Sequence, residues 1–528
     1  MKRLGVTAVA GALALSCTVA GTAEAANPLR VKDDSYRVQQ GKTLQGHSVL
    51  ANDAGAGTLV SHTAPAHGTL KINPDGSFSY TPEAGFTGTD SFTYSTSDAV
   101  KLYRTNLPPL ATIDGVTITG GSYGSSLTPV PGKAGEYYGL TDRGPNVDGP
   151  DGEKVEPLPG FTPAIGRFQL VNGKAVLKET IPLRAKDGTP YNGQANTDAN
   201  TGETIVDRSG NTLPASKNGY DSEGLVALPD GTFWVSDEYG PFITHFDAQG
   251  RAIERLSPFD GSLPAELANR VANKGMEGLT VTPDGHTLVG IMQSALQQPD
   301  LTKKPGNVAP VRIVTYDLRT RKTREYLYLL DNPKDTGTAV SEITALDATH
   351  FLVDERDGEF EPGAYKKLYK IDLSKATDVG PSSEVKGATY DAAKGGLLVG
   401  GRSIEVLSGT DGTDKSTEDL AAAGITPVAK SLAVDVGGLV TMLDPSGGFF
   451  GHDKVEGVAT TDGGRTVVVS NDSDFGIDGV TNDAPPYELH PKTLPDGTQD
   501  DGEFLAIDTT KLPAETTTAT VRITVTEH

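Results

Sequence analysis

Short stretches of alternating hydrophobic and polar residues, separated by turns rich in Gly, Pro, Asp and Asn, run through most of the chain. The clearest stretch is 221–242, DSEGLVALPDGTFWVSDEYGPF, in which two β-favouring runs flank a Pro-Asp-Gly turn at 229–231. An antiparallel hairpin places the start of its first strand beside the end of its second. We therefore expect Glu223 to lie near Asp237 and Glu238.

The same pattern recurs along the chain. In each copy a Glu precedes a predicted strand, a turn follows, and polar residues end the return strand: Glu277 with Gln293, Glu342 with Asp354-Glu355-Arg356, and Glu456 with Asp472. An earlier return strand ends in Asp142-Arg143. Hairpins that repeat at intervals of roughly 50 residues or more are typical of a β-propeller, whose inner strands line a central channel. We therefore predict six or seven blades, with the glutamates meeting at one end of the channel.

Residues 29–99 form a separate run of short strands with regular turns, which favours a β-sandwich. We expect a linker at 100–114 and the propeller at 115–528. The strong strand pattern of 518–528, TATVRITVTEH, is expected to close the propeller ring, because an unpaired edge strand is a liability. The predicted fold class is all-β, a sandwich followed by a propeller.

Composition agrees with a globular protein made of many short strands. Of the 528 residues, 36% are hydrophobic and 22% charged, and Gly and Pro are abundant at 63 and 34 residues. The formal net charge is −23. So acidic a chain disfavours nucleic acid and anionic membrane surfaces as partners and favours the binding of cations.

Residues 1–25 are typical of a secretory signal peptide, with Lys2 and Arg3 before an apolar run and an Ala-Glu-Ala cleavage site at 23–25. We expect a secreted protein, and no other apolar run approaches the length of a transmembrane segment. The single cysteine, Cys17, lies inside the signal segment, which leaves the mature chain without disulfides or thiol catalysis. Lipid attachment at Cys17 is the alternative, although the residues before it fit a lipobox poorly.

Two parts of this sequence each resemble a known family. GLTDRGPN, the 221–242 stretch, NKGMEGLTVTPDGHTLVG and KVEGVATTDGG occur in the order found in the bacterial phytase-like family, described as "esterase-like activity of phytase", over about residues 115–510. That resemblance implies a β-propeller and a secreted hydrolase directed at phosphoesters. VLAND, YTP and GTDSFTY within 29–99 resemble a cadherin-like, bacterial Ig-like repeat. This second resemblance implies a spacer or adhesion module, and with it association with the cell wall or surface.

Hydrolysis of a phosphate monoester requires neutralised oxygens, an aligned water and a stabilised leaving group, and Ca²⁺ held by carboxylates can supply all three. The candidate metal ligands are Asp142, Glu223, Asp237, Glu238, Glu277, Glu342, Asp354, Glu355, Glu456 and Asp472. The candidate residues that bind a small organic phosphate or ester are Arg143, Lys274, Arg356 and Arg402, with arginine able to bind in bidentate fashion. The predicted catalytic residues are Glu223, Asp237, Glu277, Arg143 and Arg356.

Three alternatives stand beside this hypothesis. Each repeated Glu can be structural and accept backbone N–H groups of the neighbouring blade, and the Asp-Arg pairs can be plain ion pairs. The propeller can be a non-catalytic binding module, although the interleaved Arg and Lys candidates favour the phosphoric-ester hydrolase. Carboxylic-ester hydrolysis is kept because of the family description. The G-x-S-x-G match at 120–124 gives it little support, because a Ser/Pro loop follows in place of a helix.

Overall fold

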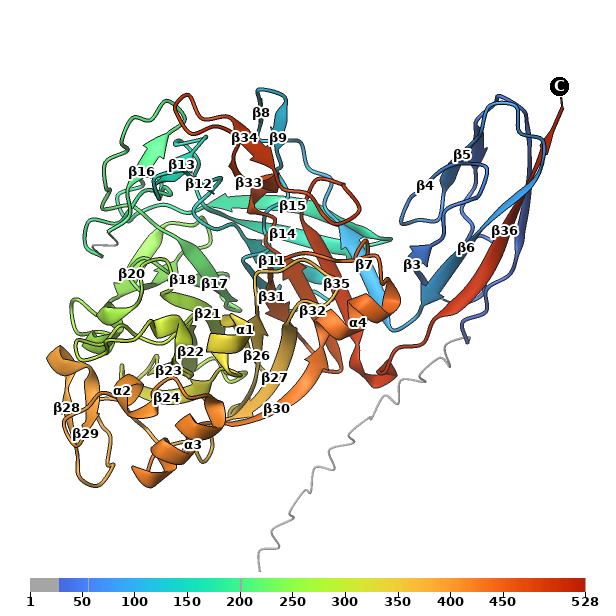
Figure 1. The fold of residues 1–528 in the computed structure, drawn as a ribbon. Coiled ribbons are helices and arrows are strands. Elements are labelled where there is room, and N and C mark those ends of the chain that lie inside the picture. The colour runs from blue at the N-terminus through green and yellow to red at the C-terminus, as the bar shows by residue number, and fades with distance from the viewer. Residues whose placement is uncertain (1–27, 56, 200–201, 528) are drawn as a thin grey trace, which may run out of the picture.

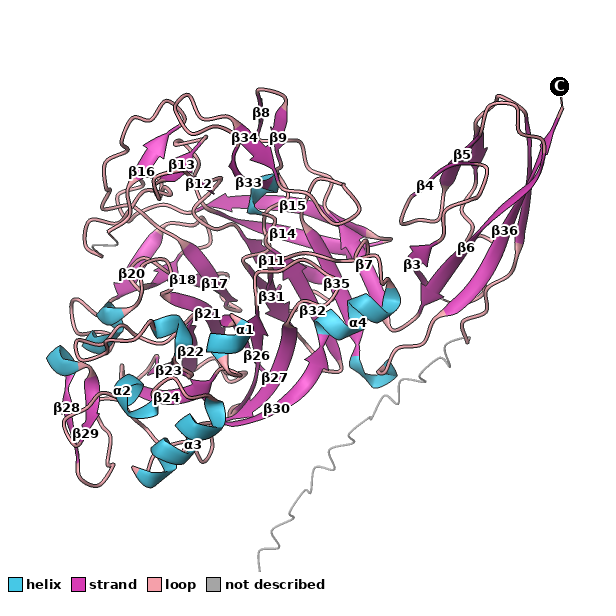
Figure 2. Ribbon diagram, viewed as in Figure 1, coloured by secondary structure: helices cyan, strands magenta, loops and turns pink. Residues whose placement is uncertain are grey.

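The computed structural model describes residues 28–55, 57–199 and 202–527 and contains two β-structured parts, a small sandwich and a larger propeller (Figure 1). Strands dominate both parts, and the helices are short (Figure 2). The predicted all-β fold, with an N-terminal Ig-like sandwich before a β-propeller, is confirmed. None of the helices in the described ranges has the length and hydrophobicity of a membrane span. The predicted signal peptide and Cys17 lie outside the described residues.

The sandwich packs a four-stranded sheet, in the order β1-β36-β6-β3, against a three-stranded sheet, β2-β5-β4. Buried aromatic residues such as Phe78, Tyr80, Phe92 and Tyr94 fill the space between the sheets. The strands are β1 (Asp34–Gln39), β2 (Leu44–Gly46), β3 (Thr58–His62), β4 (Gly68–Ile72), β5 (Phe78–Pro82), β6 (Gly88–Ser97) and β36 (Thr517–Thr526).

Strand β36 does not close the propeller as the sequence predicted. It lies between two strands of the sandwich, antiparallel to β6 and parallel to β1. Its alternating residues Ala519, Val521, Ile523 and Val525 are buried in the sandwich core, which explains this choice of partner. The C-terminal part of the expected propeller segment 115–528 therefore belongs to the sandwich.

Within the described residues, the propeller consists of five four-stranded blades rather than the predicted six or seven. The innermost strands β10, β17, β21, β25 and β31 contact one another in a closed ring. From the inside outward, the blades are β10 (Ser126–Pro129), β11 (Glu136–Leu140), β14 (Ala164–Val171), β15 (Lys174–Pro182); β17 (Ser222–Ala227), β18 (Phe233–Asp237), β19 (Ile243–Phe246), β20 (Ala252–Leu256); β21 (Met276–Val281), β22 (Thr287–Met292), β23 (Pro310–Asp317), β24 (Thr323–Leu329); β25 (Ala339–Ala345), β26 (His350–Arg356), β27 (Lys366–Asp372), β30 (Ala429–Asp435); and β31 (Val455–Ala459), β32 (Thr466–Asn471), β35 (Glu503–Asp508), β7 (Val100–Arg104).

The blade count was overestimated because several insertions between blade strands add chain without adding blades. They hold short strand pairs and helices outside the blades: β12 (Val147–Asp148), β13 (Lys154–Glu156), β16 (Ile205–Asp207), β28 (Ala388–Asp391), β29 (Gly396–Val399), β33 (Ile477–Val480), β34 (Leu489–Pro491), α1 (Pro333–Thr336), α2 (Ile404–Ser408), α3 (Thr413–Ala422) and α4 (Val436–Leu443). A further pair, β8 (Ala111–Ile113) and β9 (Val116–Ile118), follows β7.

The ring is closed by β7, which lies in the segment expected to be a linker. β7 pairs antiparallel with β35 over its whole length and completes the last blade from the N-terminal side. Its Val100 and Leu102 are buried with Leu505 and Ile507 of β35. A single parallel pairing with β15 joins the last blade to the first. The hydrophobic pattern of β7 is therefore that of a blade strand.

Candidate functional site

Three inner hairpins carry a β-bulge at a glutamate. In β21–β22 the pairing passes from Met276 to Gly278 and leaves Glu277 out of the ladder. The pairing of β17 with β18 skips Glu223, and that of β31 with β32 skips Glu456. A bulge interrupts the alternation of side chains and re-aims the extra residue. All three glutamates line one cavity of the propeller.

A glycine follows each of these glutamates and lets neighbouring inner strands approach closely. A Cβ on Gly278 would lie 2.6 Å from the nitrogen of Ile343 in β25, and one on Gly224 would lie 2.5 Å from the nitrogen of Leu279 in β21. Gly457 is enclosed in the same way by Ser470 and Leu127. The Glu-Gly pair thus combines a side chain aimed at the cavity with a backbone packed against the next blade.

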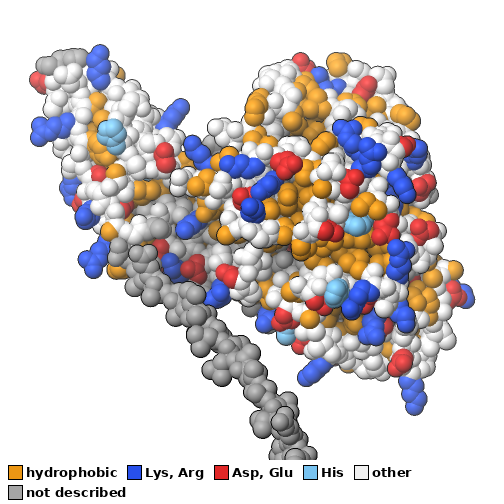
Figure 3. Space-filling model, turned by 180° about the vertical axis from the view of Figure 1, so that it is seen from behind, with side chains coloured by type: hydrophobic (Ala, Val, Ile, Leu, Met, Phe, Trp, Pro, Cys, Tyr) orange, Lys and Arg blue, Asp and Glu red, His pale blue; other side chains and the backbone are white. Residues whose placement is uncertain are grey.

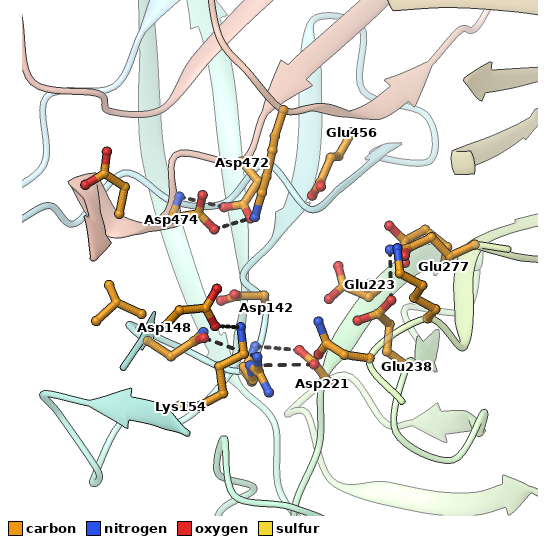
Figure 4. Close-up of a pocket in the computed structure, with 18 of the residues that line it drawn as sticks. Asp142, Asp148, Lys154, Asp221, Glu223, Glu238, Glu277, Glu456, Asp472 and Asp474 are labelled. Carbon is orange, nitrogen blue, oxygen red and sulfur yellow. Dashed lines mark hydrogen bonds and ion pairs between the residues drawn. The ribbon is translucent and has the colours of Figure 1, made fainter. Parts of the chain in front are cut away.

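The cavity has a volume of about 510 Å³ and holds many more carboxylates than cations (Figure 4). The acidic residues lining it are Asp142, Asp148, Glu203, Asp221, Glu223, Glu238, Glu277, Asp453, Glu456, Asp472, Asp474 and Asp478. The basic residues lining it are Arg143, Lys154, Lys274, Arg356 and Lys454. On the outer face shown in Figure 3, by contrast, acidic and basic side chains are interspersed. The cavity is therefore a concentrated site of negative charge that attracts cations.

Three carboxylates converge most closely. Asp221, Glu223 and Glu238 are buried, and one oxygen from each lies within 4.8 Å of the others. Asp221 immediately precedes β17, Glu223 lies in β17 and Glu238 immediately follows β18, so one hairpin supplies all three. We call Asp221, Glu223 and Glu238 the acidic triad. Glu277 and Gln293 of the next blade line the same cavity, and Gln293 Nε2 donates to Glu238 Oε1 at 2.9 Å.

Burial and mutual repulsion raise the pKa of Glu223, Glu238 and Glu277. Burial first, and then Asp221 and Glu277, hold the pKa of Glu223 well above its usual range. The pKa of Glu238 is raised likewise by burial and by Glu277. Burial also raises the pKa of Glu277 and of Glu456 to about 7. Ionising all of these groups together requires a compensating cation.

Asp142 extends the acidic row away from the triad. It lies between Asp221 and Asp472 (Figure 4), and burial followed by the charges of Asp472 and Asp221 raises its pKa well above the usual value. Burial would raise the pKa of Asp474 too, but Lys454 and Lys492 outweigh it and hold this pKa below its usual value. This end of the cavity is therefore an ion-pair network, whereas Glu223 and Glu238 of the triad form no ion pair among the described residues.

Most basic residues of the cavity are already engaged. Arg143 donates to the Tyr239 hydroxyl at 2.7 Å, and its Nε lies 3.7 Å from Asp221 Oδ2. Arg356 is hydrogen-bonded to Glu456, and Lys454 Nζ lies 2.6 Å from Asp474 Oδ1. These residues position carboxylates and have little capacity left for a substrate. Within the described ranges Lys274 makes no ion pair, although its charge acts on Glu238.

Two predicted ligands of the 342–356 segment are structural. Glu342 Oε1 accepts the N–H of Leu279 at 3.1 Å and that of Ile343 at 2.9 Å, and Ser126 donates to its other oxygen. Glu355 accepts from Tyr328 and Lys430, at 2.7 and 2.6 Å. Neither side chain lines the cavity. Glu342 thus matches the alternative in which a repeated Glu accepts backbone N–H groups of the neighbouring blade.

Three further candidates also lie outside the cavity. Asp237, the last residue of β18, accepts the N–H groups of Asp221 and Gly240. Glu238 follows it directly and lines the cavity, in keeping with the alternation of side chains in an extended chain. Asp354 is buried in β26 with neither carboxylate oxygen bonded. Arg402 is exposed in the loop between β29 and α2.

Sequence reasoning missed several cavity residues that lie next to predicted ones. Asp221 lies two residues before Glu223, and Lys454 two residues before Glu456, so the segments DSEG and KVEG carried a detectable signal. Lys154 comes from β13 in an insertion, where no repeat pointed to it. The G-x-S-x-G serine, Ser122, is buried and donates to Asp472 Oδ1 at 2.8 Å. It therefore helps to fix a carboxylate of the cavity.

The acidic triad fits a hard divalent cation. Its donor set is entirely carboxylate oxygen, which is the ligand type that Ca²⁺ and Mg²⁺ prefer. Glu277, which lines the same cavity, has a buried oxygen, Oε2, without a hydrogen-bond partner, and a bound ion is one way to balance such an oxygen. Oxygen ligands without histidine or cysteine disfavour a zinc site.

Comparisons with known proteins cover both parts of the chain. The phytase-like family model, described as "Esterase-like activity of phytase", matches residues 118–475, and the model of a bacterial Ig domain matches residues 26–124. An uncharacterized secreted protein of Arthroderma benhamiae is 28% identical over 326 residues, which cover 50% of this chain and 62% of that relative. The chain thus spans less than two thirds of the relative's length.

Two solved structures share a distant likeness with this chain. Regucalcin from Agrobacterium tumefaciens, described as a calcium-binding protein, is 11% identical and covers 90% of this chain and 96% of its own, with a TM-score of 0.25. A streptogramin B lyase is 12% identical and covers 78% of this chain and 99% of its own, with a TM-score of 0.27. Scores this low carry no argument about function.

Proposed function

This chain belongs to the phytase-like family, and from that premise we propose that it is a secreted, Ca²⁺-assisted hydrolase of phosphoric esters. The observation that carries the proposal is the acidic triad, three buried carboxylates within 4.8 Å of one another in a cavity large enough for a small organic substrate. We propose Asp221, Glu223 and Glu238 as the residues that hold Ca²⁺.

When bound, Ca²⁺ would neutralise phosphate oxygens and align a water molecule for attack. Among the protein groups, Glu277 is the proposed general base, because it lines the cavity and its pKa of about 7 suits proton transfer near neutral pH. Lys274 is the proposed phosphate-binding residue, since it lines the cavity without an ion pair in the described ranges. Arg143 and Arg356 act as positioning residues through their contacts with Asp221 and Glu456.

We also propose that the protein is exported and that the Ig-like sandwich serves as a spacer at the cell wall or surface. Support comes from the secreted relative in Arthroderma benhamiae and from the signal pattern of residues 1–25. The sandwich contributes no residue to the cavity lining, in agreement with a role apart from the reaction.

The test measures phosphate release from phytate and from p-nitrophenyl phosphate, in Ca²⁺ and after chelation. Glu223→Gln and Glu277→Gln keep side-chain volume and remove one charge each, and Glu254→Gln on the outer strand β20 is the matched control. We expect turnover in the wild type and control to need Ca²⁺, and a loss of about 100-fold or more in both cavity variants. Equal turnover in all four proteins, or turnover unaffected by chelation, would refute the assignment.

A second candidate function is a non-catalytic, cation-dependent binding module. One observation favours it: Arg143, Arg356 and Lys454 are all engaged by carboxylates and are not free to bind a phosphate. In that case Ca²⁺ raises the melting temperature while neither phosphate ester is hydrolysed. Hydrolysis of p-nitrophenyl acetate alone would instead favour the carboxylic-ester alternative.

A further inference from the structure

The loop before β21 places an amide side chain against the acidic triad. Asn273 lines the cavity, and with its amide nitrogen turned inward it donates to Asp221 Oδ2 at 2.9 Å and to Glu238 Oε2 at 3.3 Å. One short side chain therefore spans two of the three triad carboxylates. Gln293, the other amide in the cavity, donates to Glu238 Oε1 instead, so each oxygen of Glu238 faces a different amide.

The Asn273 amide has two orientations that differ by a half-turn about its last side-chain bond. A half-turn exchanges nitrogen and oxygen and leaves the rest of the residue in place. With the oxygen inward, it faces only carboxylate oxygens. That arrangement is repulsive in an empty cavity and favourable around a cation, because asparagine oxygens are ordinary ligands of Ca²⁺. A cation bound at the triad would therefore favour the orientation with the oxygen inward.

Resting on the cation site proposed above, we propose that Asn273 is a further oxygen ligand of that cation, and that in its absence the amide turns to bridge Asp221 and Glu238 by hydrogen bonds. A second observation supports a cation on this side of the cavity: Glu277, which lines it with the triad, has a buried oxygen, Oε2, without a hydrogen-bond partner. Asn273 precedes β21, so the cation would then bind oxygens from two adjacent blades.

The backbone holds Asn273 in place for this role. Its φ is 54°, in the left-handed region that asparagine and aspartate adopt more readily than other residues with side chains. A bridge between Val271 and Lys274 closes the loop, and the side chain of Arg270 donates to the carbonyl of Ala199 at 2.7 Å. The side chain can turn without a change in the loop.

Two substitutions separate a ligand from a structural hydrogen bond. Asn273→Ala removes both the oxygen that would bind the cation and the N–H donor that bridges Asp221 and Glu238. Asn273→Asp keeps the size and backbone preference and offers an oxygen in either orientation, but it loses the donor. Asn172 has the same left-handed backbone, with φ 49°, and lies in the β14–β15 turn outside the cavity. Asn172→Ala and Asn172→Asp are therefore matched controls for the backbone.

The experiment titrates CaCl₂ by calorimetry, with Tb³⁺ luminescence as a second probe, and records melting temperatures in chelator for all five proteins. We expect Asn273→Ala to bind Ca²⁺ about tenfold more weakly or worse, and Asn273→Asp to bind at least as tightly as the wild type. In chelator both Asn273 variants should melt below the wild type, because Asp221 and Glu238 lose their shared donor. The Asn172 variants should bind as the wild type does.

The outcomes distinguish this inference from the proposed function. If the wild type binds Ca²⁺ and Asn273→Ala binds it equally well, or if Asn273→Asp binds as poorly as Asn273→Ala, the ligand role is refuted and the cation site stands. If the wild type binds neither Ca²⁺ nor Tb³⁺, the cation site and the role of Asn273 both fail.

Discussion

Two adjacent hairpins, β21–β22 and β25–β26, have nearly the same sequence pattern and use their glutamates in opposite ways. In the first, the strand pairing skips Glu277, whose side chain lines the cavity. In the second, the pairing skips Ser341 and returns Glu342 to the ladder. A displacement of the bulge by one residue turns the glutamate from the cavity into the protein core, where it accepts backbone N–H groups.

The residue that follows each glutamate explains the difference. Gly278 follows Glu277 and packs against the backbone of β25, where a Cβ would lie 2.8 Å from the Cα of Glu342. Ile343 follows Glu342 and is buried in the hydrophobic core. A repeated acid in a propeller is therefore informative about function only together with its neighbour: Glu-Gly marks the cavity here, and Glu-Ile marks the scaffold.

The largest effect that separates the two hairpins should come from alanine substitutions. Glu342→Ala leaves the N–H groups of Leu279 and Ile343 buried without an acceptor, and we expect a loss of about 3 kcal/mol or more in unfolding free energy. Glu277→Ala removes an acid that burial and repulsion disfavour, and should change stability by less than about 1 kcal/mol in chelator. Denaturant unfolding at pH 8 measures both. Equal losses would erase the distinction between scaffold and cavity glutamates.

A smaller effect should come from the contact between the hairpins. Gly278→Ala places a methyl group 2.6 Å from the nitrogen of Ile343, and we expect a loss of about 2 kcal/mol because the two blades must move apart. Gly160→Ala is the control, since no atom lies within 4 Å of a Cβ at that position. If both variants unfold at the same denaturant concentration, close packing is not the reason for glycine at 278.

A pH-dependent effect concerns Asp354, which faces Glu342 in the β25–β26 register. Burial, opposed by Arg356 and Lys366, raises its pKa from 3.8 to about 8. The folded protein therefore holds a proton that the unfolded chain releases, and stability from this group is lost as pH rises from about 4 to about 8. Asp354→Asn should remove that dependence, so that its advantage in stability over the wild type grows as pH rises from 5 and is largest at pH 9.

Thermal unfolding between pH 5 and pH 9 in chelator measures this pH dependence. Because Asp354 lies outside the cavity, the difference between Asp354→Asn and the wild type should persist when Ca²⁺ is added. A difference that disappears with Ca²⁺ would place Asp354 among the cation ligands, as the sequence first suggested.

The local pattern of hydrophobic residues and turns was enough to predict much of the fold. The alternation of apolar residues and the Pro-Asp-Gly turns predicted the hairpins, and their recurrence predicted a propeller. Strand partners far apart in sequence were not predictable in this way, because Val100 and Val521 have the same alternation whichever sheet they join. The positions of the β-bulges could not be predicted for a similar reason, since a shift of one residue leaves the composition of the strand unchanged.

The candidate site was predicted in part. Glu223, Glu238, Glu277, Glu456 and Asp472 all line the cavity, because each stands at the open end of a hairpin. The arginines were harder to interpret, since a sequence shows charges and not their partners. Arg143 and Arg356 are in the cavity, yet ion pairs with acids from other segments occupy them.

The placement of β7 and β36 has a consequence for how the chain is made. β7 is synthesised early, but the strand it pairs with, β35, lies at residues 503–508. In the same way, β1 and β6 of the sandwich are joined by β36, at residues 517–526. Neither part can be completed from residues synthesised before about position 503. The nascent sandwich and the nascent propeller each carry an open strand edge until residues 503–526 have been synthesised.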